Sequence, residues 1–236
     1  MGQISLPPVE WEPAKPSAAA RLLVLLVMVL LALLMGGFIG YQIVSGRVIS
    51  TPITLPLDPR ADPIQGDVPA GTTPISHQTP FYGWKLTPKA SYTITARVIR
   101  AKNHPLDWRL MPSPTDFALG WGDLSDPAAD EWIRWSQSGR WYFYRYDLDM
   151  PYTADYLKDH SANVHLIPAT PNLSNALSQI AEGQIILLEG LLIDVDSHLG
   201  DFQYWSNTSL TRTDSGAGGC EILYIQRLVV NSLEYR

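Results

Sequence analysis

Cysteine is nearly absent from this chain of 236 residues, because Cys220 is the only one. A single cysteine excludes an intrachain disulfide, a zinc knuckle and a thioredoxin-type cysteine pair. Basic residues are also scarce: 17 Lys and Arg stand against 23 Asp and Glu, for a formal net charge of −6. Nucleic-acid-binding domains carry a basic patch or stripe. The composition therefore argues against nucleic acid as a partner.

Charge is absent from 25 consecutive positions, Leu22 to Gly46, which are rich in leucine and valine. At a helical rise of about 1.5 Å per residue the run covers about 37 Å, enough to cross a hydrocarbon core of about 30 Å. It is longer than the apolar core of a secretory signal, and no Ala-x-Ala cleavage site follows it. The run therefore predicts an uncleaved, single-pass transmembrane helix that anchors the chain in a lipid bilayer.

The charges that flank this run nearly balance, with Lys15 and Arg21 before it and Arg47 and Arg60 after it. A long domain that follows a first span is often translocated whatever its charge. We therefore expect a cytoplasmic N-terminus and an extracytoplasmic C-terminal domain. The expected organisation is a tail over 1–21, the transmembrane helix over 22–46, a proline-rich linker over 47–80 and a globular domain over 81–236.

Ala32, Gly36 and Gly40 recur every four residues in the apolar run and share one face of the expected helix. Small side chains let two helix backbones approach closely in a bilayer. This face is a candidate for self-association or for packing against a partner helix. The alternative is that these residues are ordinary for a membrane helix, or ease a kink.

Seven prolines lie between Thr51 and Pro80. Proline fixes its own backbone and biases the preceding residue to extended geometry. Two arrangements follow from this composition. The segment either forms a semi-rigid stalk that holds the domain up to about 90 Å from the membrane, or lies along the folded domain.

The domain is expected to be mainly β, because apolar and polar residues alternate over 91–100 and further short runs are rich in apolar or aromatic residues. Gly190 interrupts the longest apolar stretch, which suggests the bulge or sharp bend by which small barrels turn corners. Two helices are predicted, over about 126–137 and 172–183. We expect a small α+β domain, barrel-like of the OB type first and a sandwich second. The predicted strands are 91–100, 141–148, 184–195, 202–205 and 220–230.

A glycine-rich loop precedes the last long strand, and Gly216, Gly218 and Gly219 free its backbone for left-handed turns. Successive amides in such a loop can receive an anion, with Arg212 and Asp214 as charged neighbours. Binding of an anion or a peptide is one expectation for this loop. The other is a tight connection that binds nothing.

Two interpretations stay open for Cys220, at the end of this loop. As the nucleophile of a hydrolase or transferase it needs a base, and His160 and His165 are the candidates. As a small apolar side chain it packs in the core, where cysteine is common.

The sequence predicts no metal ion and no other cofactor. Neither a helix nor a strand brings His160 and His165, five positions apart, to one face, although Asp155 and Asp159 lie near them in sequence. The acidic turn over 194–201 lacks the glycine and the glutamate that an EF-hand loop requires.

Aromatic residues are concentrated in the 26 positions from Trp121 to Tyr146, where arginines are interleaved with them. Aromatic residues and arginine are enriched at binding hot spots, although strand alternation sends about half of such side chains into a core. The candidate recognition residues are Trp132, Trp135, Arg140 and Trp141.

Three segments of the domain are distinctive: FALGWGDLSD (residues 117–126), HSANVHLIPA (160–169) and SLTRTDSGAGGCEILYI (209–225). In these segments the chain resembles an uncharacterised group of bacterial single-span membrane proteins, and the likeness extends over residues 90–230. The resemblance implies a domain tethered to the cytoplasmic (inner) membrane of a bacterium. It carries no activity, cofactor or catalytic residue with it.

The first functional expectation is a membrane-tethered accessory or scaffold protein that is not an enzyme and whose β domain binds a membrane or periplasmic protein partner, or a second copy of itself. The motivation is an anchor, a proline-rich segment, and a domain rich in aromatic residues. A membrane-anchored hydrolase or transferase that uses Cys220 with His160 or His165 is the second expectation. A ligand- or metal-sensing domain is the third.

Overall fold

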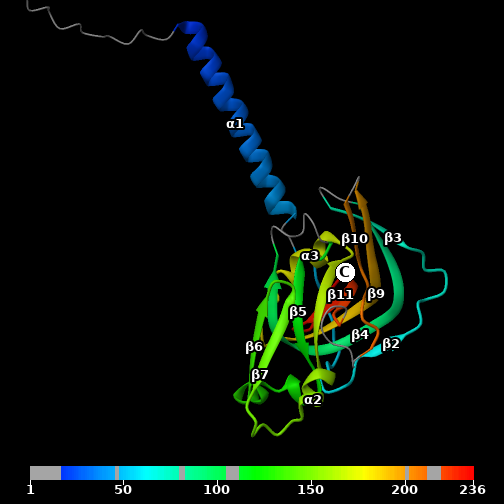
Figure 1. Ribbon diagram of the computed structural model, residues 1–236. Coiled ribbons are helices and arrows are strands. Elements are labelled where there is room, and N and C mark those ends of the chain that lie inside the picture. Colours follow the sequence, from blue (N-terminus) through cyan, green and yellow to red (C-terminus); the bar gives the residue numbers. More distant parts are fainter. Residues whose placement is uncertain (1–16, 46–47, 80–82, 105–111, 200–201, 212–218) are drawn as a thin grey trace, which may run out of the picture. The chain divides into compact units, whose positions relative to one another are not determined.

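The computed structural model describes residues 17–45, 48–79, 83–104, 112–199, 202–211 and 219–236. The chain divides into two compact units, residues 1–46 and residues 47–236. Helix α1 (Ala18–Ser45), blue in Figure 1, belongs to the first unit and includes Ala32, Gly36 and Gly40. Its stretch Ala18–Gly36 is long and apolar enough to cross a membrane. The predicted N-terminal apolar helix is therefore confirmed, and helix pairing through its small residues stays a prediction.

The second unit is mainly β, as predicted, and is built on one sheet of ten strands (Figure 1). Eight of them follow one another as neighbours, while β2 (Ile64–Gly66) and β3 (Ile75–Gln78) pair with β4. In spatial order the eight are β1 (Thr51–Pro52), β12 (Leu233–Tyr235), β11 (Glu221–Val230), β8 (Ser161–Pro168), β5 (Thr115–Gly120), β4 (Gly83–Asn103), β9 (Ile185–Leu199) and β10 (Phe202–Ser206).

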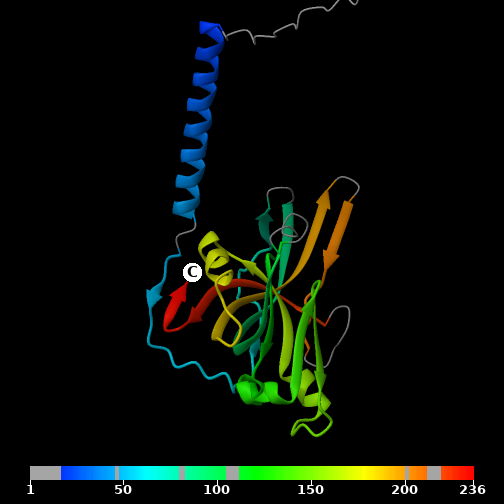
Figure 2. The ribbon, with the colours of Figure 1, turned by 90° about the vertical axis from the view of Figure 1, so that its left-hand side faces the viewer.

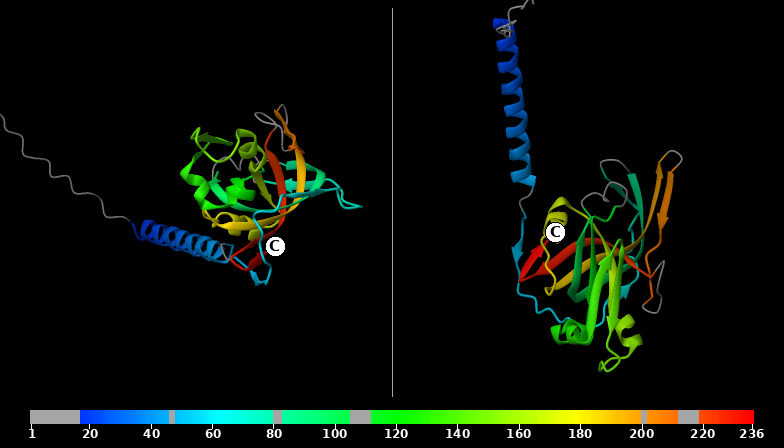
Figure 3. Two further views of the ribbon diagram at one scale, coloured as in Figure 1. Left: turned by 90° about the horizontal axis from the view of Figure 1, so that it is seen from below. Right: turned by 60° about the vertical axis from the view of Figure 1, so that its left-hand side comes forward.

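The sheet curves into a barrel-like form, because β9 pairs with both β4 and β11 (Figure 3). The five strands of this form run in the order β4, β5, β8, β11, β9, with β8 and β11 parallel. Helix α3 (Pro171–Leu177) connects β8 to β9. The expected mainly β, barrel-like domain is therefore confirmed, and the barrel-like sheet is not closed. The β9–β10 hairpin extends beyond the rest of the sheet, as Figure 2 shows in orange.

The main hydrophobic core fills the inner side of the curved sheet. Successive side chains of a strand point to opposite faces, and Ile94, Phe117 and Leu166 all belong to this core. Helix α3 adds Leu173 and Leu177 to it. The residues between these core positions therefore lie on the outer face of β5 and β8, where a buried strand can display polar side chains.

Gly190 lies where β9 comes closest to β11. A Cβ atom built at this glycine would lie 2.0 Å from the backbone oxygen of Tyr224, which no side chain tolerates. The register of β11 shifts between Ile225 and Arg227, opposite Gly190 and Glu189. The predicted irregularity thus lies in the partner strand, and the glycine itself is required by the close approach of two backbones.

The proline-rich segment takes the second of the two expected arrangements and lies along the domain. Its short strands β1, β2 and β3 pair with β12 and β4. Arg60 also donates a hydrogen bond of 2.9 Å to the Asp123 carboxylate. Its prolines suit a segment that pairs only in short stretches, because each proline removes one backbone donor.

The helix predicted over 126–137 is wrong beyond its first turn. Asp126 accepts a hydrogen bond from the Ala128 amide and Pro127 opens a 3-10 helix, η3 (Pro127–Glu131). The chain then continues as β6 (Ile133–Ser138), which pairs with β7 (Trp141–Tyr146) in a separate two-stranded sheet. Ile133 and Trp135 alternate as buried residues along β6, so burial at strand period overrides the local helix signal.

Candidate functional site

Four polar side chains meet on the outer face of β5, β8 and β11. They belong to Asp116, Asn163, His165 and Cys220. Asp116 in β5 is directly opposite His165 in β8. The register of β11 against β8 is given by Glu221, which is opposite Val164. Cys220, one residue before Glu221, therefore adjoins Asn163 and His165, which share one face of β8 at a spacing of two. The core residues that alternate with them, Phe117 and Val164 among them, hold this register in place.

Asp116 is the centre of this group. It is 1% exposed, and its Oδ1 atom is 2.8 Å from Nδ1 of His165 and 2.9 Å from Nη1 of Arg140. Its Oδ2 atom is 2.8 Å from Nε2 of His104. Burial raises the pKa of this carboxyl, but hydrogen bonds from the two histidines and the charges of His165 and Arg140 outweigh it and lower the pKa to about 2. Asp116 is therefore ionised at every physiological pH.

His165 lies between Asp116 and Cys220. Burial lowers the pKa of its imidazole, yet hydrogen bonds with Asp116 and Cys220 and the charges of both raise it to about 9. The Nδ1 atom is taken by Asp116, which leaves Nε2 as the ring nitrogen available to the thiol. The imidazole is therefore protonated near neutral pH and sits beside the sulfur.

Asn163 completes the surroundings of the thiol. Its Nδ2 atom donates to the backbone oxygen of Arg140 at 2.9 Å and to Sγ of Cys220 at 3.5 Å. Gln137 donates to its Oδ1 atom at 3.2 Å, which fixes the orientation of the amide. The amide therefore holds a hydrogen-bond donor against the sulfur.

Cys220 and His165 open into a cavity of about 370 Å³, called here the thiol pocket. The β6–β7 turn contributes Arg140 and Trp141, and β10 contributes Tyr204. Tyr204 is held edge-on against Trp84, with their ring centroids 5.6 Å apart. The other lining residues are Pro112, Ser113, Ile167, Val195, Ser206, Asn207 and Ile222. The cavity falls within the size range of small-molecule sites, and its strand residues come from β7, β8, β9, β10 and β11.

The pKa values of His165 and Asp116 predict how stability varies with pH. The pKa of His165 is raised from 6.5 to about 9, so its stabilisation is complete below pH 6.5 and is lost as the pH rises to about 9. The pKa of Asp116 is lowered from 3.8 to about 2, so its contribution is present above pH 3.8 and is lost as the pH falls to about 2. Urea unfolding midpoints of the wild type and of His165→Gln should therefore converge between pH 6.5 and about 9; a constant difference over that range would contradict the assignment.

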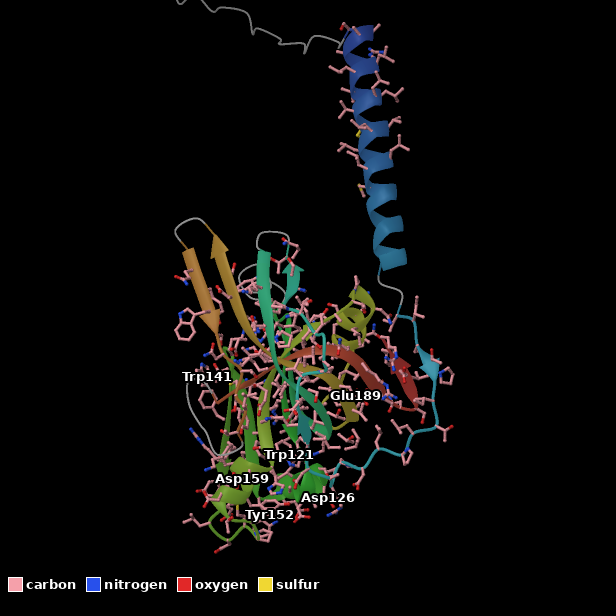
Figure 4. All side chains as sticks on the ribbon, turned by 90° about the vertical axis from the view of Figure 1, so that its right-hand side faces the viewer. Trp121, Asp126, Trp141, Tyr152, Asp159 and Glu189 are labelled. Carbon is pink, nitrogen blue, oxygen red and sulfur yellow. The ribbon has the colours of Figure 1, made fainter. Side chains whose placement is uncertain are left out.

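The structure brings His165, and not His160, to Cys220. His160 follows α2 (Ala154–Asp159), and its ring stacks on Tyr156 with a centroid separation of 3.8 Å. It lines another cavity, of about 420 Å³, together with Asp159. Figure 4 shows Asp159 and Trp141, which mark the two cavities, at separate places on the domain. Among the residues that the structure describes, no group of three or more His, Cys, Asp and Glu side chains is arranged to hold a metal ion.

The predicted recognition residues are divided between core and surface. Trp135 is 5% exposed and donates a hydrogen bond to Asp130 at 3.1 Å, so it belongs to a core cluster and not to the surface. Trp132 is partly buried against the same core cluster. Arg140 and Trp141 do line the thiol pocket, and Trp141 is 43% exposed. Alternation along β6 and β7 accounts for the division.

The predicted anion-binding loop lies mostly outside the residues that the structure describes. Arg212, Asp214, Gly216 and Gly218 lie outside the described residues, and Gly219 is described as half-buried. Anion or peptide binding by this loop stays a prediction.

Sequence reasoning missed Asp116 and Asn163. A signal for Asn163 was present, because HSANVH places Asn163 and His165 two positions apart, on one strand face. Asp116 left no such signal, since it is 49 residues from His165 and reaches it only through the pairing of β5 with β8.

Comparison of the chain with protein-family models, with curated proteins and with solved structures finds no match.

Proposed function

We propose that the domain is a thiol-dependent acyl hydrolase or acyltransferase, with Cys220 as nucleophile and His165 as acid and base. The observation that carries this proposal is the contact series from Asp116 through His165 to Cys220 at a cavity wall. A nucleophile, a base and a carboxylate that orients the base recur in this arrangement on unrelated folds.

The residues have distinct roles in the proposed reaction. The Cys220 thiolate attacks the acyl carbonyl carbon, a carbon–sulfur bond forms, and the leaving group departs with the proton of the His165 imidazolium. Neutral His165 then takes a proton from water or from an acceptor hydroxyl, whose oxygen attacks the thioester. The carbon–sulfur bond breaks, the acyl product leaves, and thiolate and imidazolium are restored. Asp116 acts as a positioning residue, because it holds Nδ1 of the ring and stabilises its charge.

A burst experiment tests the proposal on the full chain in lipid nanodiscs. p-Nitrophenyl acetate should release one equivalent of p-nitrophenolate per chain in a fast phase and leave an acetyl group on Cys220, detected by intact mass. Prior treatment with iodoacetamide should abolish the burst, and Cys220→Ala should lack it. Because the chain has a single cysteine, the thiol that is modified is unambiguous. A burst of equal size in Cys220→Ala, or none in the wild type, would overturn the assignment.

A protein-binding role is a second candidate, favoured by exposed aromatic side chains on β7 and β10. Trp141 and Phe143 in β7 are 43% and 51% exposed, and Trp205 in β10 is 67% exposed. Aromatic side chains of this kind anchor protein interfaces. Co-purification of a partner from mild detergent that is lost on replacement of Phe143 and Trp205 with serine would support it. A second copy of the chain is one such partner. The third expectation from the sequence, a metal- or ligand-sensing domain, stays a prediction.

For either candidate we propose a single-pass protein of the bacterial cytoplasmic membrane, with the N-terminus inside the cell and the domain outside. The support is the apolar helix α1 and the resemblance of the three distinctive segments. A reporter fused to the C-terminus that is active only outside the cytoplasm tests the orientation.

A further inference from the structure

The residues that line the thiol pocket indicate which kind of acyl group fits it. Most of the wall is apolar, and its floor is formed by Ile167, Val195 and Ile222, which are at most 4% exposed. These side chains come from β8, β9 and β11 and belong to a second hydrophobic cluster, separate from the main core. A cavity floored by buried aliphatic side chains favours an apolar ligand, because filling it removes apolar surface from water.

The charged side chains of the thiol pocket lie together. Arg140 and His165 are both bound to Asp116 Oδ1, next to Cys220. Among the lining residues that the structure describes, none is a carboxylate. A ligand with a polar, electron-rich end and an uncharged chain matches this division, since its carbonyl meets the cations and its chain meets the aliphatic floor. A substrate that places an ammonium or guanidinium group in the cavity does not match it.

The outer rim of the thiol pocket is aromatic. Trp141 and Tyr204 line it, and Trp141 is 43% exposed. Trp and Tyr suit a boundary between water and apolar groups, because each ring carries one polar atom on a large apolar body.

We infer that the thiol pocket takes the chain of an aliphatic acyl ester or thioester, so that the substrate class is a fatty acyl donor and not a peptide. This inference rests on the proposed function. With the chain on Ile167, Val195 and Ile222, the acyl carbon lies at the polar end of the cavity, where Cys220 attacks it. The aliphatic floor thus selects the substrate and the polar cluster performs the chemistry.

Alkylation of Cys220 by N-alkylmaleimides of increasing length tests the inference without relying on turnover. The reagents are the ethyl, butyl, hexyl and octyl compounds, applied to the full chain in lipid nanodiscs and followed by intact mass. The rate should rise about threefold to fourfold for each methylene that enters the cavity, and should level off once the cavity is full.

Two variants of β10 distinguish the effect of the cavity on the alkylation rate from the effect of reagent partitioning into lipid. Ser206→Trp places a large ring in the thiol pocket, whereas Gln203→Trp adds the same ring on the opposite face of the strand, where Gln203 is exposed. Reagents partition into lipid equally in both, so the comparison is made between variants at each chain length. The length dependence should be lost in Ser206→Trp and retained in Gln203→Trp.

The possible results are distinguishable. Fast alkylation by iodoacetamide with no dependence on maleimide length would overturn the acyl-chain inference and leave the proposed nucleophile intact. A length dependence that survives in Ser206→Trp would also overturn the inference. Slow alkylation by every reagent in the folded protein, with fast alkylation in urea, would overturn the proposed function and the inference with it.

Discussion

Replacing Asp116 with asparagine is expected to destabilise the domain by about 3–5 kcal/mol, the cost of removing one partner from a buried ion pair. The carboxylate is 1% exposed and accepts from Arg140, His104 and His165 at 2.8–2.9 Å. An asparagine keeps the shape but removes the charge. It leaves the partly buried guanidinium of Arg140 and the partly buried imidazolium of His165 without the counter-charge that Asp116 supplies. The free energy of unfolding in urea at pH 7 measures the loss.

Asp123→Asn is the matched control for this prediction. Its carboxylate also accepts from an arginine at 2.9 Å, but the side chains of Asp123 and Arg60 are 51% and 61% exposed. Exposed ion pairs contribute about 0–1 kcal/mol, so this variant should unfold close to the wild type. Equal, small effects of the two substitutions would show that Asp116 does not hold the polar cluster together. The titration of His165, followed by NMR, should also shift to lower pH in Asp116→Asn, because the carboxylate raises the pKa of that ring.

Replacing His165 with glutamine is expected to slow turnover of p-nitrophenyl acetate by about 10²–10⁴-fold, the contribution of a positioned acid and base. Glutamine can still hydrogen-bond, but it neither carries a proton to the leaving group nor removes one from water. The burst should become slow while the protein remains folded, which circular dichroism checks.

His160→Gln is the control for His165→Gln, because it is the same change at a histidine that lines the other cavity. It should leave the burst and the turnover at the wild-type level. If both variants lose activity equally, the loss is structural. If neither does, His165 is not the base and Cys220 acts without it.

Local sequence signals predicted the features that depend on near neighbours in the chain. An uncharged run over 22–46 specified an apolar helix, since α1 needs no partner to satisfy its backbone. Alternation over 91–100 predicted part of β4, because the side-chain period of a strand is a property of its own backbone. Short runs rich in apolar or aromatic residues predicted the strands that became β7, β9, β10 and β11. Asp126 and Pro127 likewise marked a true helical start.

Where local sequence signals and burial favoured different structures, contacts in the tertiary structure determined the conformation of the segment. Residues 133–138 follow a helix start yet form β6, because Ile133 and Trp135 are buried at strand period against β5 and its neighbours. The proline-rich segment was compatible with a stalk, and pairing with β4 and β12 placed it on the domain. In both cases contacts with distant residues outweighed a preference worth a few tenths of a kcal/mol per residue.

By itself the sequence determined an apolar helix, a β-rich domain and a short set of reactive side chains, because each is visible within a few residues. Only the tertiary structure decided which of those side chains meet. Cys220 had two candidate histidines, and the parallel pairing of β8 with β11 selected His165. Asp116 joined it through antiparallel pairing with β5. Strand register is set by core packing across the whole sheet, and it is this register that assembles a thiol, an imidazole and a carboxylate at the edge of one cavity.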